Sequence, residues 1–275
     1  MQRYLNESDV IGSITLQLHH PNTKHKLWVL VEGETDQKLY GNLITGKNTV
    51  IERVHGGVTA LRKAMAALII KSPRIIGIRD ADFLHLNGQQ EIIDRLFLTD
   101  AHDAEMMMVA CDKAWQQVVA EYLPEKRTDF AQLRSDLLLS LRFLGGLRWL
   151  NDSQQLELNF KAGITNFYDA ENLAIPNQMK CIEIIASCSP NKTDIPTERD
   201  ISEKIMAITD DYNLCQGHDF ECAFSLHVKA KTNKGISDTD VGKALRLAYR
   251  LEDFVTTSLY QQLKNWESET RNMLF

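Results

Sequence analysis

The sequence predicts an α/β fold in which a parallel sheet is flanked by helices, with a largely helical insertion and C-terminal region. Over the first 110 residues, short apolar runs of strand length alternate with segments in which apolar residues recur at helical spacing. Helical spacing predominates over most of the remaining chain. Regular alternation of strand and helix is typical of a parallel sheet covered by helices.

Four segments have the composition of buried strands. They are apolar runs too short for helices, at residues 27–31, 49–54, 74–79 and 95–99. Two segments between them, residues 35–43 and 58–70, repeat apolar residues at helical spacing, and Pro73 ends the second. A Met-rich helix is expected after the fourth strand.

The remainder of the chain is expected to be mainly helical. Helical spacing is found over residues 106–145, 198–212 and 238–266, with Ser237 or Asp238 as the amino-terminal cap of the last segment. Residues 156–160 are a further strand candidate, and the stretch up to Pro196 has no predicted topology. We therefore expect an α/β core of residues 1–110, a helical insertion of residues 111–200, and a helical C-terminal part of residues 201–275 that packs back on the core.

Composition limits the functional classes. The 275 residues are 44% hydrophobic, enough for a folded core, but no run of about eighteen apolar residues predicts a membrane helix. The first nine residues lack the pattern of a signal peptide, so we expect a cytoplasmic protein without a membrane partner. The five cysteines are scattered, which favours reduced thiols over a zinc site. Because the net charge is −6, binding to nucleic acid requires a local basic surface or bridging metal ions.

Three carboxylates follow directly after predicted buried strands. Glu32 follows the first strand, and Asp80 and Asp82 follow the third. The carboxyl ends of parallel strands face the same crevice, so the three side chains are expected to converge although they are far apart in sequence. Hard oxygen ligands of this kind suit Mg²⁺ or Mn²⁺. Either motif alone is an ordinary acidic turn, but their shared placement favours a metal site.

The same residues resemble a known family. Val31-Glu32-Gly33-Glu34-Thr35-Asp36 and Arg79-Asp80-Ala81-Asp82 resemble the Toprim signature, in which a glutamate-glycine pair closes one strand and Asp-x-Asp closes a later one. With Tyr40 four residues on, the first motif is similar to that of the nucleases related to the overcoming-lysogenization-defect proteins. It also resembles the compact Toprim effector of PARIS-type anti-phage systems, which accompanies an ABC-type ATPase.

This resemblance implies roles for the acidic residues. Glu32 would be a metal ligand or the general base for the attacking water, and Asp80 with Asp82 would hold Mg²⁺ or Mn²⁺. Asp36 or Glu105, which follows His102-Asp103-Ala104, would complete a second metal position. The alternatives remain open: Asp36 as a helix cap and Glu105 as a solvated residue at a helix start.

Further matches are found late in the chain. In Gly217-His218-Asp219, His218 would orient the phosphate or protonate the leaving oxygen, or would be a structural histidine after a glycine that caps the preceding helix. A set of basic residues could bind a phosphate backbone, or form a solvated face, and comprises Lys229, Lys231, Lys243, Arg246 and Arg250. The last three are expected to share one helix face because of their three- and four-residue spacing.

The function implied is phosphodiester hydrolysis by a metal-dependent endonuclease. The substrate would be DNA or a structured RNA such as tRNA. By resemblance to the PARIS-type effectors, the chain would be the toxic component of abortive infection, restrained by an ABC-type ATPase and dimerising on activation.

Two other functions are alternatives to a nuclease. A phosphatase of the haloacid-dehalogenase type would use Asp80 as nucleophile and Asp82 as acid, but it expects threonine where this chain has Leu84. A non-catalytic Toprim-like module would dock on a partner or nucleic acid without using its carboxylates.

Overall fold

The computed structural model describes residues 7–124, 128–232 and 234–275 in two compact units. The first unit comprises Met1–Leu84, Gly88–Asp100 and Arg250–Phe275, and the second comprises His85–Asn87 and Ala101–Tyr249. Residues 1–6, on which the expectation of no signal peptide partly rests, lie outside the described residues. In the described part of the chain, no helix has the length and apolar character needed to cross a bilayer.

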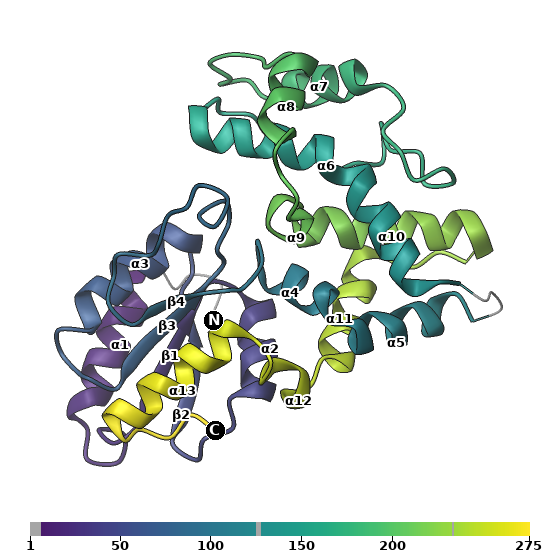
Figure 1. The fold of residues 1–275 in the computed structure, drawn as a ribbon. Helices are drawn as coiled ribbons and strands as arrows, with labels where there is room; N and C mark the ends of the chain where they lie inside the picture. Colours follow the sequence, from purple (N-terminus) through teal and green to yellow (C-terminus); the bar gives the residue numbers. More distant parts are fainter. Residues whose placement is uncertain (1–6, 125–127, 233) are drawn as a thin grey trace. The chain divides into compact units, whose positions relative to one another are not determined.

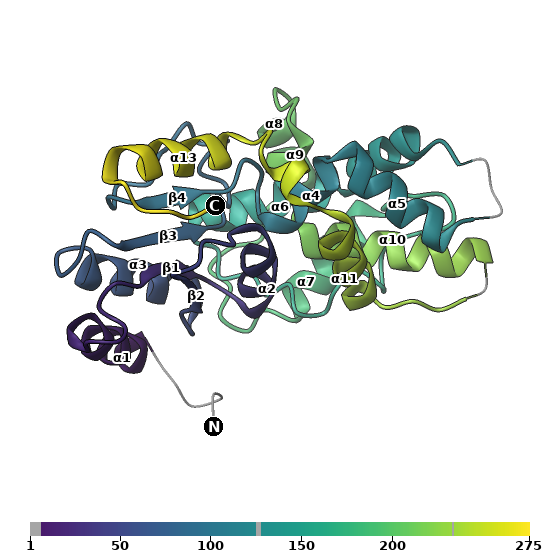
Figure 2. The ribbon, with the colours of Figure 1, turned by 90° about the horizontal axis from the view of Figure 1, so that it is seen from below.

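The first unit contains a four-stranded sheet (Figure 1). Its strands are β1 (Leu27–Val31), β2 (Thr49–Arg53), β3 (Ile75–Arg79) and β4 (Leu96–Leu98). The strand order is β2-β1-β3-β4, every pairing is parallel, and the strands lie side by side in that order in Figure 2. The predicted α/β fold with a parallel sheet flanked by helices is therefore confirmed.

Helices cover both faces of this sheet (Figures 1 and 2). One face packs against α1 (Glu7–His19) and α3 (Gly57–Leu68), and the other is covered by α2 (Glu34–Leu43) and α13 (Ser258–Thr270). Trp28 and Leu30 of β1 are buried with Leu61 and Met65 of α3 in one hydrophobic cluster. A short helix, α12 (Leu251–Phe254), packs on α2, where Phe254 makes an edge contact with Tyr40.

Strand composition follows position in the sheet. All five residues of β1 and of β3, the two central strands, are buried, as expected for strands covered on both faces. The edge strand β2 is only partly buried along its length. In the β1 and β3 pairing, Leu30 lies opposite Gly77, so the residues just past Val31 and just past Arg79 reach the same edge of the sheet.

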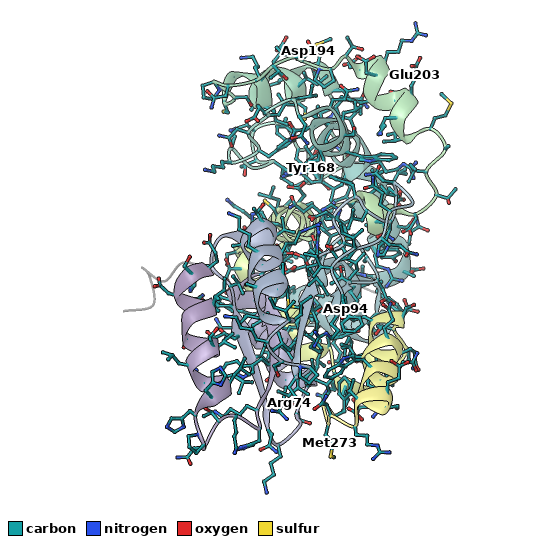
Figure 3. The ribbon with its side chains drawn as sticks, turned by 90° about the vertical axis from the view of Figure 1, so that its left-hand side faces the viewer. Arg74, Asp94, Tyr168, Asp194, Glu203 and Met273 are labelled. Atoms are coloured by element: carbon teal, nitrogen blue, oxygen red, sulfur yellow. The ribbon has the colours of Figure 1, made fainter. Side chains whose placement is uncertain are left out.

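The second unit is helical. Its helices are α4 (Ala104–Ala110), α5 (Asp112–Tyr122), α6 (Phe130–Gln154), α7 (Gln178–Ser187), α8 (Glu198–Ile205), α9 (Asp211–Leu214), α10 (Gly217–Thr232) and α11 (Asp238–Ala248). The indole of Trp115 is fully buried and makes edge contacts with Phe220 and Phe224. Tyr168, labelled in Figure 3, shares a hydrogen bond of 2.8 Å with the Ser140 hydroxyl.

The expected strand at residues 156–160 is wrong. Leu156 and Leu158 are buried, which explains their alternation, but Gln155 and Glu157 have left-handed backbone conformations with φ of 54° and 61°. Left-handed residues interrupt the extended backbone of a strand. The amide of Leu158 is satisfied by the Asn151 side chain instead of a neighbouring strand.

The helical segments near the C-terminus are shorter than expected. The segment predicted at residues 198–212 is divided into α8 and α9, and that at residues 238–266 is divided into α11, α12 and α13. The predicted cap is confirmed, because the Ser237 hydroxyl accepts a hydrogen bond from the Asp240 amide. The three expected segments map onto both units: residues 101–249 form most of the second unit, and residues 250–275 belong to the unit that contains the sheet.

Candidate active site

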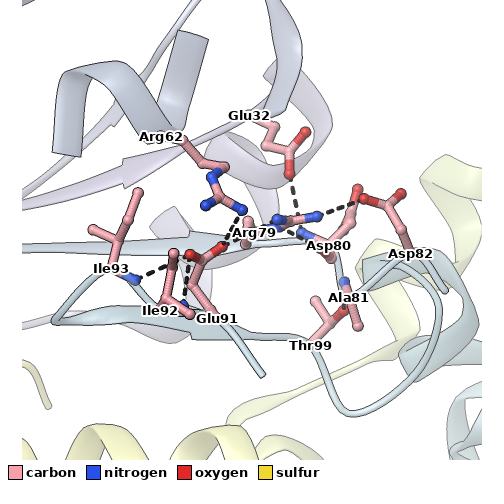
Figure 4. A network of polar contacts seen from close by, with 10 residues as sticks. All are labelled: Glu32, Arg62, Arg79, Asp80, Ala81, Asp82, Glu91, Ile92, Ile93 and Thr99. Carbon is pink, nitrogen blue, oxygen red and sulfur yellow. Dashed lines mark hydrogen bonds and ion pairs between the residues drawn. The ribbon is translucent and has the colours of Figure 1, made fainter. Parts of the chain in front are cut away.

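Glu32 and Asp80 lie at the carboxyl ends of β1 and β3, which are hydrogen-bonded neighbours. The backbone amide of Asp80 donates to Glu32 Oε1 over 3.2 Å (Figure 4). The predicted convergence of these two strand ends is therefore found in the structure. Because the two strands are paired directly, sheet geometry alone holds the two residues together.

The electrostatic environment of Glu32 is unfavourable for a carboxylate. Burial, and then the negative charges of Asp82 and Asp36, raise its pKa from the ordinary 4.5 to about 7, against the opposing effect of Arg79 and the Asp80 amide. A carboxyl group that titrates near neutral pH can exchange a proton under physiological conditions. Excess negative charge around it also favours a bound cation.

Asp82 is held by an arginine from the strand that delivers it. Arg79 Nη2 donates to Asp82 Oδ2 over 2.7 Å, with the Arg79 side chain 5% exposed and that of Asp82 47% exposed. The Asp82 backbone has a φ of 48°, in the left-handed region that a non-glycine residue adopts at a cost. The carboxylate is therefore directed by both the turn and the guanidinium.

The turn between the two aspartates is fixed from β4. The amide of Ala81 donates to the hydroxyl of Thr99 over 3.0 Å, and the amide of Thr99 donates to the Arg79 carbonyl over 3.1 Å. Ala81 and Thr99, which are labelled in Figure 4, are both buried. Asp80 and Asp82 thus project from a turn that the sheet itself supports.

Asp36 has a capping role. Its Oδ2 accepts a hydrogen bond of 2.9 Å from the Gly33 amide at the start of α2, and the residue is 7% exposed. This contact corresponds to the capping alternative considered for Asp36. The Asp36 charge also contributes to the raised pKa of Glu32, so the residue influences the site electrostatically.

The donor set fits a hard divalent cation by its chemistry. Glu32, Asp80 and Asp82 supply only carboxylate oxygens, the ligands that Mg²⁺ and Mn²⁺ prefer, and a cation would offset the burial and the negative charges that raise the Glu32 pKa. Within the described residues, no three His, Cys, Asp or Glu side chains are grouped closely enough to hold a metal ion as they stand. The contacts described above engage one oxygen each of Glu32 and Asp82.

Glu105 and His218 belong to the second unit. Glu105 lies in the first turn of α4 and is partly buried. The side chain of His218 is 70% exposed, lies 3.6 Å from Asp238 Oδ2, and lines a cavity of about 890 Å³ together with Arg148 and Asp219.

The glycine of the Gly217-His218-Asp219 motif has a packing role. It begins α10, and its amide donates to Asp103 Oδ2 over 2.7 Å. A Cβ atom at Gly217 would lie 2.3 Å from Glu105 Cβ, so only glycine permits this approach. Asp219 is buried and makes two hydrogen bonds to Arg148. The interpretation of Gly217 as a cap of the preceding helix is wrong, because α9 ends at Leu214.

The basic residues do not form one stripe. Lys229 and Lys231 lie in the last turn of α10, where cations also stabilise the helix dipole. Lys243 and Arg246 lie on α11, but this helix ends at Ala248, so the expectation that Arg250 shares their helix face is wrong. Arg250 precedes α12 in the first unit, and Lys243 pairs with Asp240.

No protein-family model matches this chain, and no curated protein sequence is significantly similar to it. The resemblance to Toprim nucleases therefore rests on the motif residues.

Several residues around the site were not singled out from the sequence. Arg79 and Glu91 form a buried ion pair of 3.1 Å, to which Arg62 of α3 adds a second contact (Figure 4). Arg79 belongs to the Arg79-Asp80-Ala81-Asp82 motif, so its position beside the acidic residues could have been inferred from the sequence. Glu91 lies in an irregular loop without a periodic pattern, so only the fold reveals its contact.

Proposed function

We propose that this chain is a metal-dependent nuclease that hydrolyses phosphodiester bonds in nucleic acid. The observation that carries the proposal is the pairing of Glu32 with the Asp80 turn at neighbouring strand ends, where the pKa of Glu32 is raised to about 7. Acidic groups concentrated at the carboxyl edge of a parallel sheet are placed where such folds bind ligands. A phosphodiester is a suitable ligand because a divalent cation can neutralise the negative charge of both the carboxylates and the phosphate.

The three carboxylates share the cation in this proposal, and Glu32 has a second candidate task. Asp80 and Asp82 would hold the cation with Glu32, and Arg79 keeps the Asp82 carboxylate oriented. A bound Mg²⁺ or Mn²⁺ would polarise the phosphate and favour ionisation of a water. Glu32, which titrates near neutral pH, would serve as a ligand or accept the proton of the attacking water.

The resemblance described above extends the proposal to substrate and control. The substrate would be a structured RNA such as tRNA, or DNA, with Lys229, Lys231, Lys243 and Arg246 as candidate contacts to its backbone. As in PARIS-type systems, the chain would be a toxic effector restrained by an ABC-type ATPase, and it would dimerise when released.

Expression in bacteria without the ATPase tests the proposal. Four strains would express the parent chain, Glu32→Ala, Asp80→Ala or the control Glu34→Ala. The ends of cellular RNA and DNA would then be sequenced in each strain. Glu34 belongs to the same motif, but its side chain is exposed and pairs with Lys38 and Arg53.

The proposal expects discrete new ends with the parent chain and with Glu34→Ala, and none with the other two variants. New RNA ends identify an RNase and new DNA ends a DNase. Identical ends in all four strains would contradict the proposal.

A further inference from the structure

A buried guanidinium connects three acceptors beside the candidate metal site (Figure 4). Arg79 Nε donates to the Asp80 carbonyl over 2.8 Å, Nη1 to Glu91 Oε2 over 3.1 Å, and Nη2 to Asp82 Oδ2 over 2.7 Å. Each donor group faces a different acceptor, which the planar arginine fork allows and a lysine ammonium does not reproduce. Arg79 therefore relates the position of the Asp82 carboxylate to that of Glu91.

Glu91 is a fixed anchor for Arg79. Its side chain is 2% exposed. Oε1 accepts hydrogen bonds of 2.9 Å and 3.0 Å from the amides of Ile92 and Ile93, and Oε2 also lies 3.2 Å from Arg62 Nη1. A carboxylate with two backbone donors and two guanidinium partners has little freedom to move. The orientation of Arg79 is consequently set from the side opposite Asp82.

Within the described residues, the contact with Arg79 is the only hydrogen bond or ion pair of the Asp82 side chain. Asp82 is nearly half exposed, and its left-handed backbone already places it in a conformation that the surrounding contacts must maintain. Without Arg79, its carboxylate would sample several rotamers in solvent. A metal ligand that must be ordered on binding loses affinity through that ordering.

We propose that Arg79 is a positioning residue that holds the Asp82 carboxylate ready for the divalent cation, and that Glu91 fixes Arg79 in that role. This inference rests on the proposed function only in assigning a cation to Glu32, Asp80 and Asp82. Partners that orient metal ligands commonly change metal affinity by about 10-fold to 100-fold when mutated.

A competing role for Arg79 gives the opposite result. A guanidinium near carboxylates also repels an incoming cation and competes for the same oxygen. If competition dominated, Arg79→Met would bind a divalent cation more tightly than the parent, and Arg79→Lys, which keeps the charge, would match the parent. If positioning dominates, both variants bind the cation more weakly.

The test measures Mn²⁺ binding in the absence of nucleic acid. The electron paramagnetic resonance signal of free Mn²⁺ reports how much Mn²⁺ remains unbound. The variants are Arg79→Lys, Arg79→Met and Glu91→Gln. Arg95→Lys is the matched control, because Arg95 is a part-buried arginine of the same unit and donates to the carbonyls of Ser72 and Ile69. Thermal unfolding reports the structural cost of each change.

We expect Arg79→Lys and Glu91→Gln to weaken Mn²⁺ binding about tenfold or more, with Arg95→Lys within about twofold of the parent. If Arg79→Lys does not fold, Glu91→Gln, which retains Arg79, decides by the same readout. Parent-like Mn²⁺ affinity in the folded variants, or tighter binding by Arg79→Met, overturns the inference.

Failure of the proposed function is distinguishable from failure of this inference. If the parent chain cleaves no nucleic acid but binds Mn²⁺, and Arg79→Lys weakens that binding, the nuclease proposal is wrong and the positioning role of Arg79 is retained. If the parent chain cleaves nucleic acid but Arg79→Lys binds Mn²⁺ as tightly as the parent, the positioning role is wrong and the nuclease proposal is retained. Absence of Mn²⁺ binding by the parent chain overturns both.

Discussion

Replacement of Glu32 by glutamine should stabilise the metal-free protein above neutral pH. Glutamine retains a side-chain oxygen that can accept the Asp80 amide, but it carries no charge. The folded-state pKa of Glu32 is raised from 4.5 to about 7, so the folded parent chain retains a proton that the unfolded chain releases. The contribution of Glu32 to parent stability therefore declines as pH rises from 4.5 to about 7 and levels off above that, while Glu32→Gln lacks this decline.

The magnitude follows from the two pKa values. At about 1.4 kcal/mol per pH unit, the interval between 4.5 and about 7 corresponds to about 3 kcal/mol. The stability difference between Glu32→Gln and the parent should grow by up to that amount between pH 4.5 and pH 8. Solvent around the partly buried side chain reduces the effect, so growth of about 1–3 kcal/mol is expected.

The assay is native-state hydrogen exchange in EDTA, followed by mass spectrometry for the peptide that contains β1. A local measurement is needed because a chain with two compact units need not unfold in one step. Comparing variant and parent at the same pH cancels the intrinsic exchange rates. Glu34→Gln is the control, since contacts with Lys38 and Arg53 lower the pKa of Glu34, so the pH dependence of its contribution falls at acidic pH and not near neutral pH. A pH-independent difference for Glu32→Gln would refute the reasoning.

Three further predictions concern packing, burial and helix capping within the two units. Gly217→Ala should destabilise the second unit by about 1–3 kcal/mol, because its Cβ would lie 2.6 Å from Asp103 Oδ1; Gly235→Ala, with open space around it, should have little effect in denaturant unfolding. Glu221→Gln should gain stability relative to the parent as pH rises from 4.5 to 9, by at most about 1.4 kcal/mol per pH unit, since burial and then neighbouring acids raise the Glu221 pKa to about 9. A flat pH profile in hydrogen exchange of α10 argues against this. Asp100→Ala should cost about 1–2 kcal/mol, seen as faster exchange in α13, because the carboxylate of Asp100 accepts the first two amides of that helix; unchanged exchange contradicts a capping role.

The central strands were predictable because their composition leaves few alternatives. The runs that became β1 and β3 are apolar at nearly every position, as strands buried on both faces must be, and are too short for helices. Once these strands were placed, the positions of Glu32 and Asp80 followed from sheet geometry. The hydrogen bond between their strand ends is the structural counterpart of that prediction.

The elements that sequence patterns did not predict depend on tertiary contacts. Helix α1 contains Gly12, Ser13 and Thr15, which are weak helix formers, and of its residues only Val10 and Ile14 are fully buried. The end of α11 has no glycine or proline to mark it; the chain leaves the helix at a buried, extended Tyr249. Local propensity predicts neither the formation of α1 nor the end of α11, because packing against other elements determines both.

The same limit applies to the site. Glu91 belongs to no periodic segment and no motif, and its contact with Arg79 exists because a loop closes over the end of β3. Asp36 shows the opposite case: its capping alternative was evident from its position three residues after Gly33. Sequence motifs therefore located the carboxylates, while the residues that orient them could be identified only from the structure.

Anomalous diffraction from crystals equilibrated with Mn²⁺ tests the central claim most directly. The account predicts a Mn²⁺ peak within about 2.0–2.3 Å of carboxylate oxygens from Asp80 and at least one of Glu32 and Asp82, absent in Asp80→Asn, which keeps the backbone amide that binds Glu32. A peak bound only elsewhere, or none at Mn²⁺ concentrations that support nucleic-acid cleavage, would contradict it.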